Sequence, residues 1–109
     1  MSNVESQPRS DWSTLPREGC ANVEARVLLA KDGLAVANLR FGRDATIDRH
    51  DAPFDINVIC VAGSGFASID DDEFPIKAGQ TVRWPKNRDH CLWTTDDTME
   101  TIMIERQGV

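Results

Sequence analysis

Short stretches of apolar and β-branched residues alternate with turn residues along most of the chain. Apolar residues do not recur at a 3.6-residue period in any window of helical length, so we expect no helix. Strands of this length and spacing, separated by glycine-rich turns, are typical of an all-β sandwich or small barrel. The predicted strands are residues 23–30, 34–41, 46–50, 54–62, 66–69, 74–77, 81–84, 90–94 and 99–105.

Turn residues separate these strands at defined places. Asp32-Gly33 is typical of a hairpin turn. We expect a loop at residues 42–45 and a turn at residues 63–65, whose sequence is Gly-Ser-Gly. Pro85 ends a strand because proline cannot donate to a β-ladder. The acidic run of residues 70–73 lacks the ligand spacing of a calcium loop, so it predicts a solvated turn.

Strict alternation in residues 34–41 predicts which side chains share a face. Ala35, Ala37, Leu39 and Phe41 fall on one face of that strand, and the residues between them fall on the other.

The first 20 residues differ from the rest. They are polar, and they predict an N-terminal arm (residues 1–20) before a barrel domain of residues 21–109. Trp12 and Leu15 stand out as large apolar groups in the arm. Either the arm is a loose tail, or Trp12 packs on the domain or on a partner subunit.

Composition narrows the class of protein. The chain has 109 residues, which is one domain, and 18 acidic against 12 basic residues give a formal charge of −6. An acidic surface repels phosphate, so we expect no nucleic-acid partner and no docking on an anionic membrane. No apolar run is long enough to span a bilayer, and the polar start lacks the apolar core of a secretion signal. Three widely spaced cysteines predict reduced thiols, and we expect a cytoplasmic protein.

Two histidines are the main candidates for chemistry. His50 and His90 each stand at a predicted strand end beside a turn, and both have carboxylates nearby in the sequence. In a rolled barrel, distant strands converge on one cavity, so these imidazoles can meet at its mouth. In isolation the two histidines are equally compatible with ordinary surface or core positions.

The spacing around these histidines resembles that of the cupin family. The first cupin motif, G(X)5HXH(X)3,4E(X)6G, aligns with Gly42, Asp48, His50 and a closing Gly63. The second, G(X)5PXG(X)2H(X)3N, aligns with Gly79, Pro85, Asn87, His90 and Thr94. The resemblance implies an all-β fold, the double-stranded β-helix or jelly-roll barrel of a small single-domain cupin, open at one end.

The chain departs from the motif at two ligand positions. In metal-binding cupins, both histidines and the glutamate of the first motif and the histidine of the second usually bind a divalent ion. Asp48 replaces the first histidine here. The glutamate position falls on Ile56 when counted back from Gly63, and on Asp55 when counted forward from His50. A slip of one residue turns a side chain to the other face of a strand, although a bulge can absorb it.

The two matching histidines, together with the carboxylates at the departing positions, predict a divalent-metal site made by His50, His90, Asp48 and Asp55. Two histidines with one or two carboxylates suit iron, manganese or zinc, and nickel is also a candidate. If Ile56 occupies the glutamate position, the set is incomplete, and the barrel can equally have lost its metal. His50 then serves as an acid or base with Asp48 as its orienting partner.

A ligand pocket is predicted beside the histidines. Its candidate lining residues are Ile56, Val58, Cys60, Trp84 and Trp93. Aromatic walls suit an apolar or ring-shaped ligand, whereas simple core packing is the alternative for each of these side chains. Strict alternation would turn Trp93 away from His90, and it would turn Arg49 away from both Asp48 and His50.

Three functions follow from these patterns. The first is a metal-dependent cupin, dioxygenase- or isomerase-like, that binds a small organic molecule. The second is a metal-free barrel that binds or senses a small apolar ligand without catalysis. The third is an interaction module without chemistry. The resemblance also implies a homodimer formed through the β-sandwich.

Overall fold

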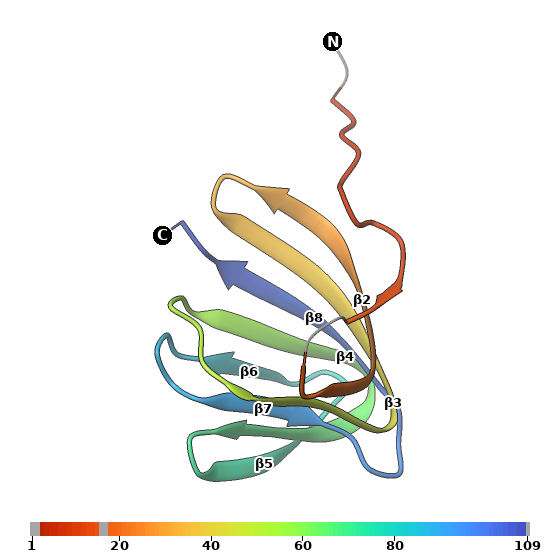
Figure 1. Ribbon diagram of the computed structural model, residues 1–109, viewed down its shortest axis with the longest axis vertical. Helices are drawn as coiled ribbons and strands as arrows, with labels where there is room; N and C mark the ends of the chain where they lie inside the picture. The colour runs from red at the N-terminus through yellow and green to blue at the C-terminus, as the bar shows by residue number, and fades with distance from the viewer. Residues whose placement is uncertain (1–2, 16–17, 109) are drawn as a thin grey trace.

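The computed structural model describes residues 3–15 and 18–108, and every regular element in these ranges is a β-strand (Figure 1). The strands are β1 (Ser13–Thr14), β2 (Cys20–Lys31), β3 (Leu34–His50), β4 (Ile56–Ile69), β5 (Asp72–Lys77), β6 (Thr81–Trp84), β7 (His90–Trp93) and β8 (Met99–Arg106). The all-β barrel expected from the sequence is therefore confirmed. The described residues include no helix that is long and apolar enough to cross a membrane.

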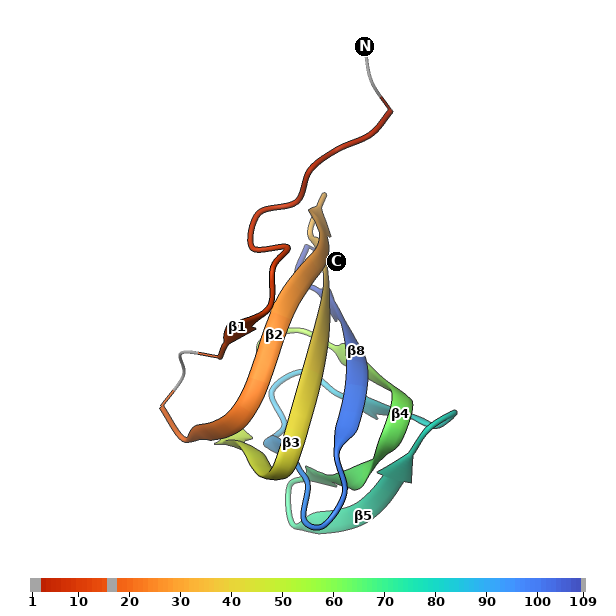
Figure 2. The ribbon, with the colours of Figure 1, turned by 90° about the vertical axis from the view of Figure 1, so that its right-hand side faces the viewer.

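Two long strands close the barrel. β3 pairs with both β7 and β8, and β4 also pairs with both of them, so the four strands form a ring. Figure 2 shows β8 between β3 and β4. β2 and β1 extend the ring beyond β3, while β5 and β6 pair with opposite halves of β4. This arrangement leaves β2 and the short β1 at the margin of the sheet.

The predicted breaks within β3 and β4 are wrong, because both strands continue through them. β3 crosses the expected loop at residues 42–45 and changes partner from β8 to β7 there. β4 crosses the expected turn at residues 63–65 and changes its partners from β6 and β8 to β5 and β7. Gly63 allows this bend with a φ of +72°. Strands that pass from one sheet to another bend at such irregular positions without ending.

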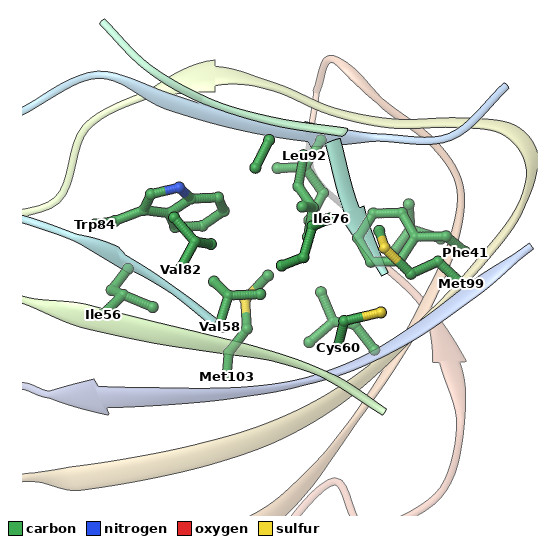
Figure 3. Packing of buried hydrophobic residues seen from close by; sticks show 14 of the residues in the cluster. Phe41, Ile56, Val58, Cys60, Ile76, Val82, Trp84, Leu92, Met99 and Met103 are labelled. Atoms are coloured by element: carbon green, nitrogen blue, oxygen red, sulfur yellow. The ribbon is translucent and has the colours of Figure 1, made fainter. Parts of the chain in front are cut away.

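The core lies inside the ring, and Ile56, Val58 and Cys60 of β4 point into it (Figure 3). Ala67 in the second half of β4 belongs to the same buried cluster. Val58 and Cys60 are 0 % and 1 % exposed, and they pack among residues of β3, β5, β7 and β8. Leu39 and Phe41 are buried on the face of β3 that alternation groups with Ala35 and Ala37. The period of two in residues 34–41 therefore identifies the inward face of this strand.

The N-terminal arm lies against the domain along β2. Ser13 and Thr14 pair with β2, the amide of Leu15 donates to Val23 O at 3.0 Å, and the amide of Val27 donates to Arg9 O at 2.8 Å. The ring of Trp12 lies against the guanidinium groups of Arg26 and Arg40, whose Cζ atoms are 4.7 Å and 4.2 Å from the ring centroid. Of the two alternatives for the arm, packing on the domain is the one observed.

Candidate functional site

A cavity of about 630 Å³ opens between the arm, β2, β3 and β8 on one side and the start of β4 and the end of β6 on the other. Most of its wall is apolar. The inward side chains of β3, β4, β6 and β8 that line it are Ala35, Ala37, Leu39, Ile47, Ile56, Trp84 and Met103. His50 stands in this wall at the end of β3. Arg9, Arg26 and Glu105 also line the cavity. A largely apolar wall with a few polar and titratable groups is typical of a small-molecule site.

A β-bulge turns His50 into the cavity. Ile47 pairs with Leu92 and His50 pairs with His90, so β3 contains one residue more than β7 between these two pairs. Ile47 and His50 consequently both face inward although three positions separate them. Nδ1 of His50 lies 2.7 Å from the backbone oxygen of Asp48, which fixes the ring orientation.

His90 lies behind His50, away from solvent. It begins β7 and is 1 % exposed. Its ring stacks on Trp84, with centroids 4.0 Å apart and planes 3° apart, and it meets the edge of His50 at 4.5 Å. The Nε2 atoms of the two histidines are 3.2 Å apart. The motif spacing therefore brings the two imidazoles together, with His50 on the cavity side.

The hydrogen bonds define the proton positions of a neutral pair. A carbonyl oxygen only accepts, so Nδ1 of His50 carries the hydrogen that it donates to Asp48 O. Nε2 of a neutral His50 then has a lone pair, and Nε2 of His90 donates its hydrogen across the 3.2 Å gap. His50 is thus the acceptor of the pair, and in this state both of its ring nitrogens are engaged, Nδ1 with Asp48 O and Nε2 with His90.

Asp48 does not face His50. The same bulge leaves Asp48 exposed, where its carboxylate accepts a hydrogen bond from the amide of Arg49 at 2.9 Å and lies against Gly19. Regular alternation from His50 placed Asp48 on the inner face, and that placement is wrong because the strand is irregular. The orienting partner of His50 is the backbone oxygen of Asp48 and not its carboxylate.

Asp55 is likewise held away from the histidines. Its carboxylate accepts hydrogen bonds from the amide of Lys86 at 2.9 Å and from Arg83 at 3.0 Å. These two donors, the Lys86 amide first, lower the pKa of Asp55 below its ordinary value. The next residue, Ile56, takes the inward position and lines the cavity. The motif's glutamate position falls on Ile56 when counted back from Gly63 and on Asp55 when counted forward from His50. Of these two residues, Ile56 is the one that faces inward.

The other predicted pocket residues separate into three groups. Ile56 and Trp84 line the cavity. Val58 and Cys60 face the same way along β4 but lie deeper, in the closed core (Figure 3). Trp93 is outside, because it stacks on Phe66 at 5.7 Å and lies with Arg49 over the outer surface. The prediction of Trp93 in the pocket is therefore wrong, and strict alternation along β7 was the correct guide.

Several cavity residues were missed. The small side chains of Ala35 and Ala37 leave the space that the cavity occupies, and the alternation of residues 34–41 was the signal for them. Thr14 and Leu15 of the arm also line the cavity. Leu15 had one signal, since it is a large apolar residue within a polar arm.

The four predicted metal ligands do not fit together as one site. His50 and His90 have converging Nε2 atoms, and a separation of 3.2 Å is compatible with two histidines on one ion at about 2.0–2.1 Å each. Asp48 and Asp55 are engaged elsewhere. Within residues 3–15 and 18–108, no three His, Cys, Asp or Glu side chains are grouped closely enough to hold a metal ion. Among the described residues, the imidazole pair has no carboxylate grouped closely enough with it to complete a metal site.

Comparison with solved structures identifies the fold. A cupin-like protein from Thermotoga maritima matches with a TM-score of 0.79 at 20% identity, over 95% of this chain and 82% of that one. The polyketide cyclase RemF from Streptomyces resistomycificus matches with a TM-score of 0.84 at 13% identity, over 94% and 78% of the two chains. A cupin 2 conserved barrel domain protein from Leptotrichia buccalis matches with a TM-score of 0.74 at 25% identity, over 85% and 44%.

The structure is thus a small cupin-type barrel, as the motif spacing predicts. No protein-family model matches the chain, and the search of curated proteins finds no match. The structural neighbours include enzymes and proteins of unknown function, so the fold by itself does not define a reaction.

Proposed function

We propose that this protein binds a small organic molecule in the 630 Å³ cavity, and that His50 makes the polar contact with it. The observation that carries the proposal is the position of His50 as the imidazole in an otherwise largely apolar wall, with His90 3.2 Å behind it. The ligand has an apolar body that packs on Ile56 and Trp84. It also has one hydroxyl or similar group that donates a hydrogen bond to Nε2 of His50 in place of His90.

His90 is a positioning residue in this proposal. It is buried between Trp84 and His50, so it does not reach the cavity and acts through His50. In the free protein its Nε2 hydrogen occupies the lone pair of His50; when a ligand hydroxyl takes that place, His90 carries its hydrogen on Nδ1 instead. This arrangement favours a ligand with a weakly acidic hydroxyl.

Binding of 2-naphthol tests the proposal, because this probe has an apolar bicyclic body, one weakly acidic hydroxyl and its own fluorescence. Removal of one hydrogen bond from His50→Ala should weaken binding about threefold to tenfold. In the wild type, 2-naphthol should shift the imidazole resonances of His50 in NMR spectra. The Trp93→Ala variant is the matched control, since Trp93 lies outside the cavity. Equal affinity of His50→Ala and wild type would contradict the proposed contact.

A divalent metal at the two Nε2 atoms is a second candidate. The 3.2 Å separation and the backbone hydrogen bond that orients His50 favour it, because metal-binding histidines commonly donate their other nitrogen to a carbonyl. His90 would have to carry its hydrogen on Nδ1, so that both Nε2 lone pairs face the ion.

Titration with Fe²⁺, Mn²⁺, Zn²⁺ and Ni²⁺ tests this candidate by calorimetry. The expected result is a 1:1 complex that either His50→Ala or His90→Ala abolishes and that Asp48→Asn and Asp55→Asn leave intact. Lack of binding by the wild type would exclude it. Loss of binding in either Asp variant would show that a carboxylate moves to the site.

Pairing of two copies stays a prediction of the resemblance. Ile59 of β4 and Ile102 of β8 are opposite one another on the outer face of the barrel, and Val61 is 42 % exposed. Light scattering at micromolar concentration should give the mass of a dimer, and a monomer would contradict the prediction.

A further inference from the structure

The N-terminal arm supplies part of the cavity wall. Arg9, Ser13, Thr14 and Leu15 line the same cavity as His50, and the hydrophobic part of this contribution is Leu15, which packs against the core. Without the arm, the cavity would be open along the free edge of β2. Any ligand bound beside His50 is therefore covered on one side by a segment outside the ring of β3, β4, β7 and β8.

Few interactions hold this segment. β1 has two residues, and two further backbone hydrogen bonds join the described part of the arm to β2, from Leu15 to Val23 and from Val27 to Arg9. The amide of Ala30 in β2 also donates to Gln7 Oε1 at 3.0 Å. The ion pair of Glu5 with Lys31 is about half exposed on both sides, so it contributes little. Segments with few buried contacts open locally while the rest of a fold stays intact.

Trp12 makes the most specific contact of the arm. Its ring faces the guanidinium groups of Arg26 and Arg40, which come from neighbouring strands. Both arginines are held by other partners, since Arg26 donates to Asn38 at 3.0 Å and Arg40 donates to Glu24 at 2.9 Å. Trp12 therefore meets two guanidinium groups that are already ordered, and the cation–π contact loses little side-chain entropy.

We propose that the arm is a movable wall of the ligand cavity, that the contact of Trp12 with Arg26 and Arg40 holds it closed, and that its opening sets the rate at which ligand enters and leaves. This inference rests on the proposed function, because it concerns the same cavity. It adds Trp12, outside the cavity wall, as the residue that controls ligand exchange.

Hydrogen exchange measures the opening without any ligand. The amide of Val27 donates to Arg9 O, so its protection depends on the closed arm. Loss of two cation–π contacts in Trp12→Ala should speed exchange of this amide about fivefold to thirtyfold. Trp93→Ala should leave it unchanged. The amide of Met103 is the internal control, because its strand has partners on both sides.

The rate at which 2-naphthol dissociates, followed by stopped-flow fluorescence, measures how opening of the arm affects ligand exchange. Trp12→Ala should raise the dissociation rate by about the same factor as Val27 exchange. A disulfide between Ser13→Cys and Ala25→Cys, which are directly opposite in the β1–β2 pair, should lower the rate about tenfold or more until it is reduced.

The outcomes separate the two proposals. Unchanged Val27 exchange in Trp12→Ala would overturn the role of Trp12. Binding of 2-naphthol with a dissociation rate that neither Trp12→Ala nor the disulfide alters would overturn the movable wall and leave the proposed function standing. Failure of both wild type and Trp12→Ala to bind 2-naphthol would overturn the proposed function, and the inference with it.

Discussion

Nε2 of His50 and Nε2 of His90 lie 3.2 Å apart although 40 positions separate the two residues in the chain. β3 and β7 pair at these two residues, and the stack of His90 on Trp84 holds the second ring in place. The geometry of the pair therefore depends on Trp84 at the end of β6 as much as on the histidines.

Replacement of Trp84 should damage both stability and the histidine pair. Trp84 is 2 % exposed, so Trp84→Ala should lower the free energy of unfolding by about 3–5 kcal/mol in urea denaturation. Trp84→Phe keeps a ring under His90 and should cost about 1–2 kcal/mol. Trp93→Ala is the comparison, because Trp93 is only half-buried and should cost less than Trp84→Ala. An equal loss at both positions would contradict this assignment of the core.

Asp55 should make acid stability depend on pH. Hydrogen bonds from Lys86 and Arg83 lower its pKa in the folded protein, while the unfolded value is about 3.9. A depressed folded pKa stabilises the protein above the unfolded pKa, and this contribution disappears as the pH falls through the folded pKa. The stability difference between wild type and Asp55→Asn should therefore be constant above about pH 5 and should shrink toward pH 2. A difference that grows on acidification would contradict the assignment.

Cys60 should resist alkylation in the native protein. It is 1 % exposed, and burial raises the pKa of its thiol, so both access and thiolate population are reduced. Burial also raises the pKa of Cys91, whose thiol donates to Ile47 O at 2.9 Å. Native protein at pH 8 should react with iodoacetamide at Cys20 first, and mass spectrometry of the peptides identifies the site. Fast labelling of Cys60 without denaturant would show that the core opens.

Local patterns were enough to predict the inward face of β3 and the approach of the two histidines. The alternation of residues 34–41 predicts the buried Leu39 and Phe41, and the motif spacing predicts that His50 and His90 meet. Both predictions depend only on the number of residues between positions, within one strand in the first case and within the motif in the second.

The environment of Asp48 and Asp55 could not be predicted in the same way. One extra residue in β3 between Ile47 and His50 reverses the face of Asp48, and a bulge has no fixed sequence signature. Asp55 is held by donors about 30 positions away in the chain, which only the folded barrel brings near. The continuity of β4 was missed for a related reason, since Gly-Ser-Gly is compatible with both a turn and a bend within a strand.

That bend predicts that Gly63 tolerates a side chain less well than Gly79 does. Both have positive φ, +72° and +90°, so any side chain costs roughly 1 kcal/mol in backbone strain at either position. At Gly63 an added Cβ would also lie 1.9 Å from Thr98 O, whereas at Gly79 it would meet nothing within 4 Å. Gly79→Ala should therefore cost about 1 kcal/mol in urea denaturation, and Gly63→Ala about 3 kcal/mol or more, since β4 and the turn before β8 must separate. Similar losses at the two positions would show that β4 bends elsewhere.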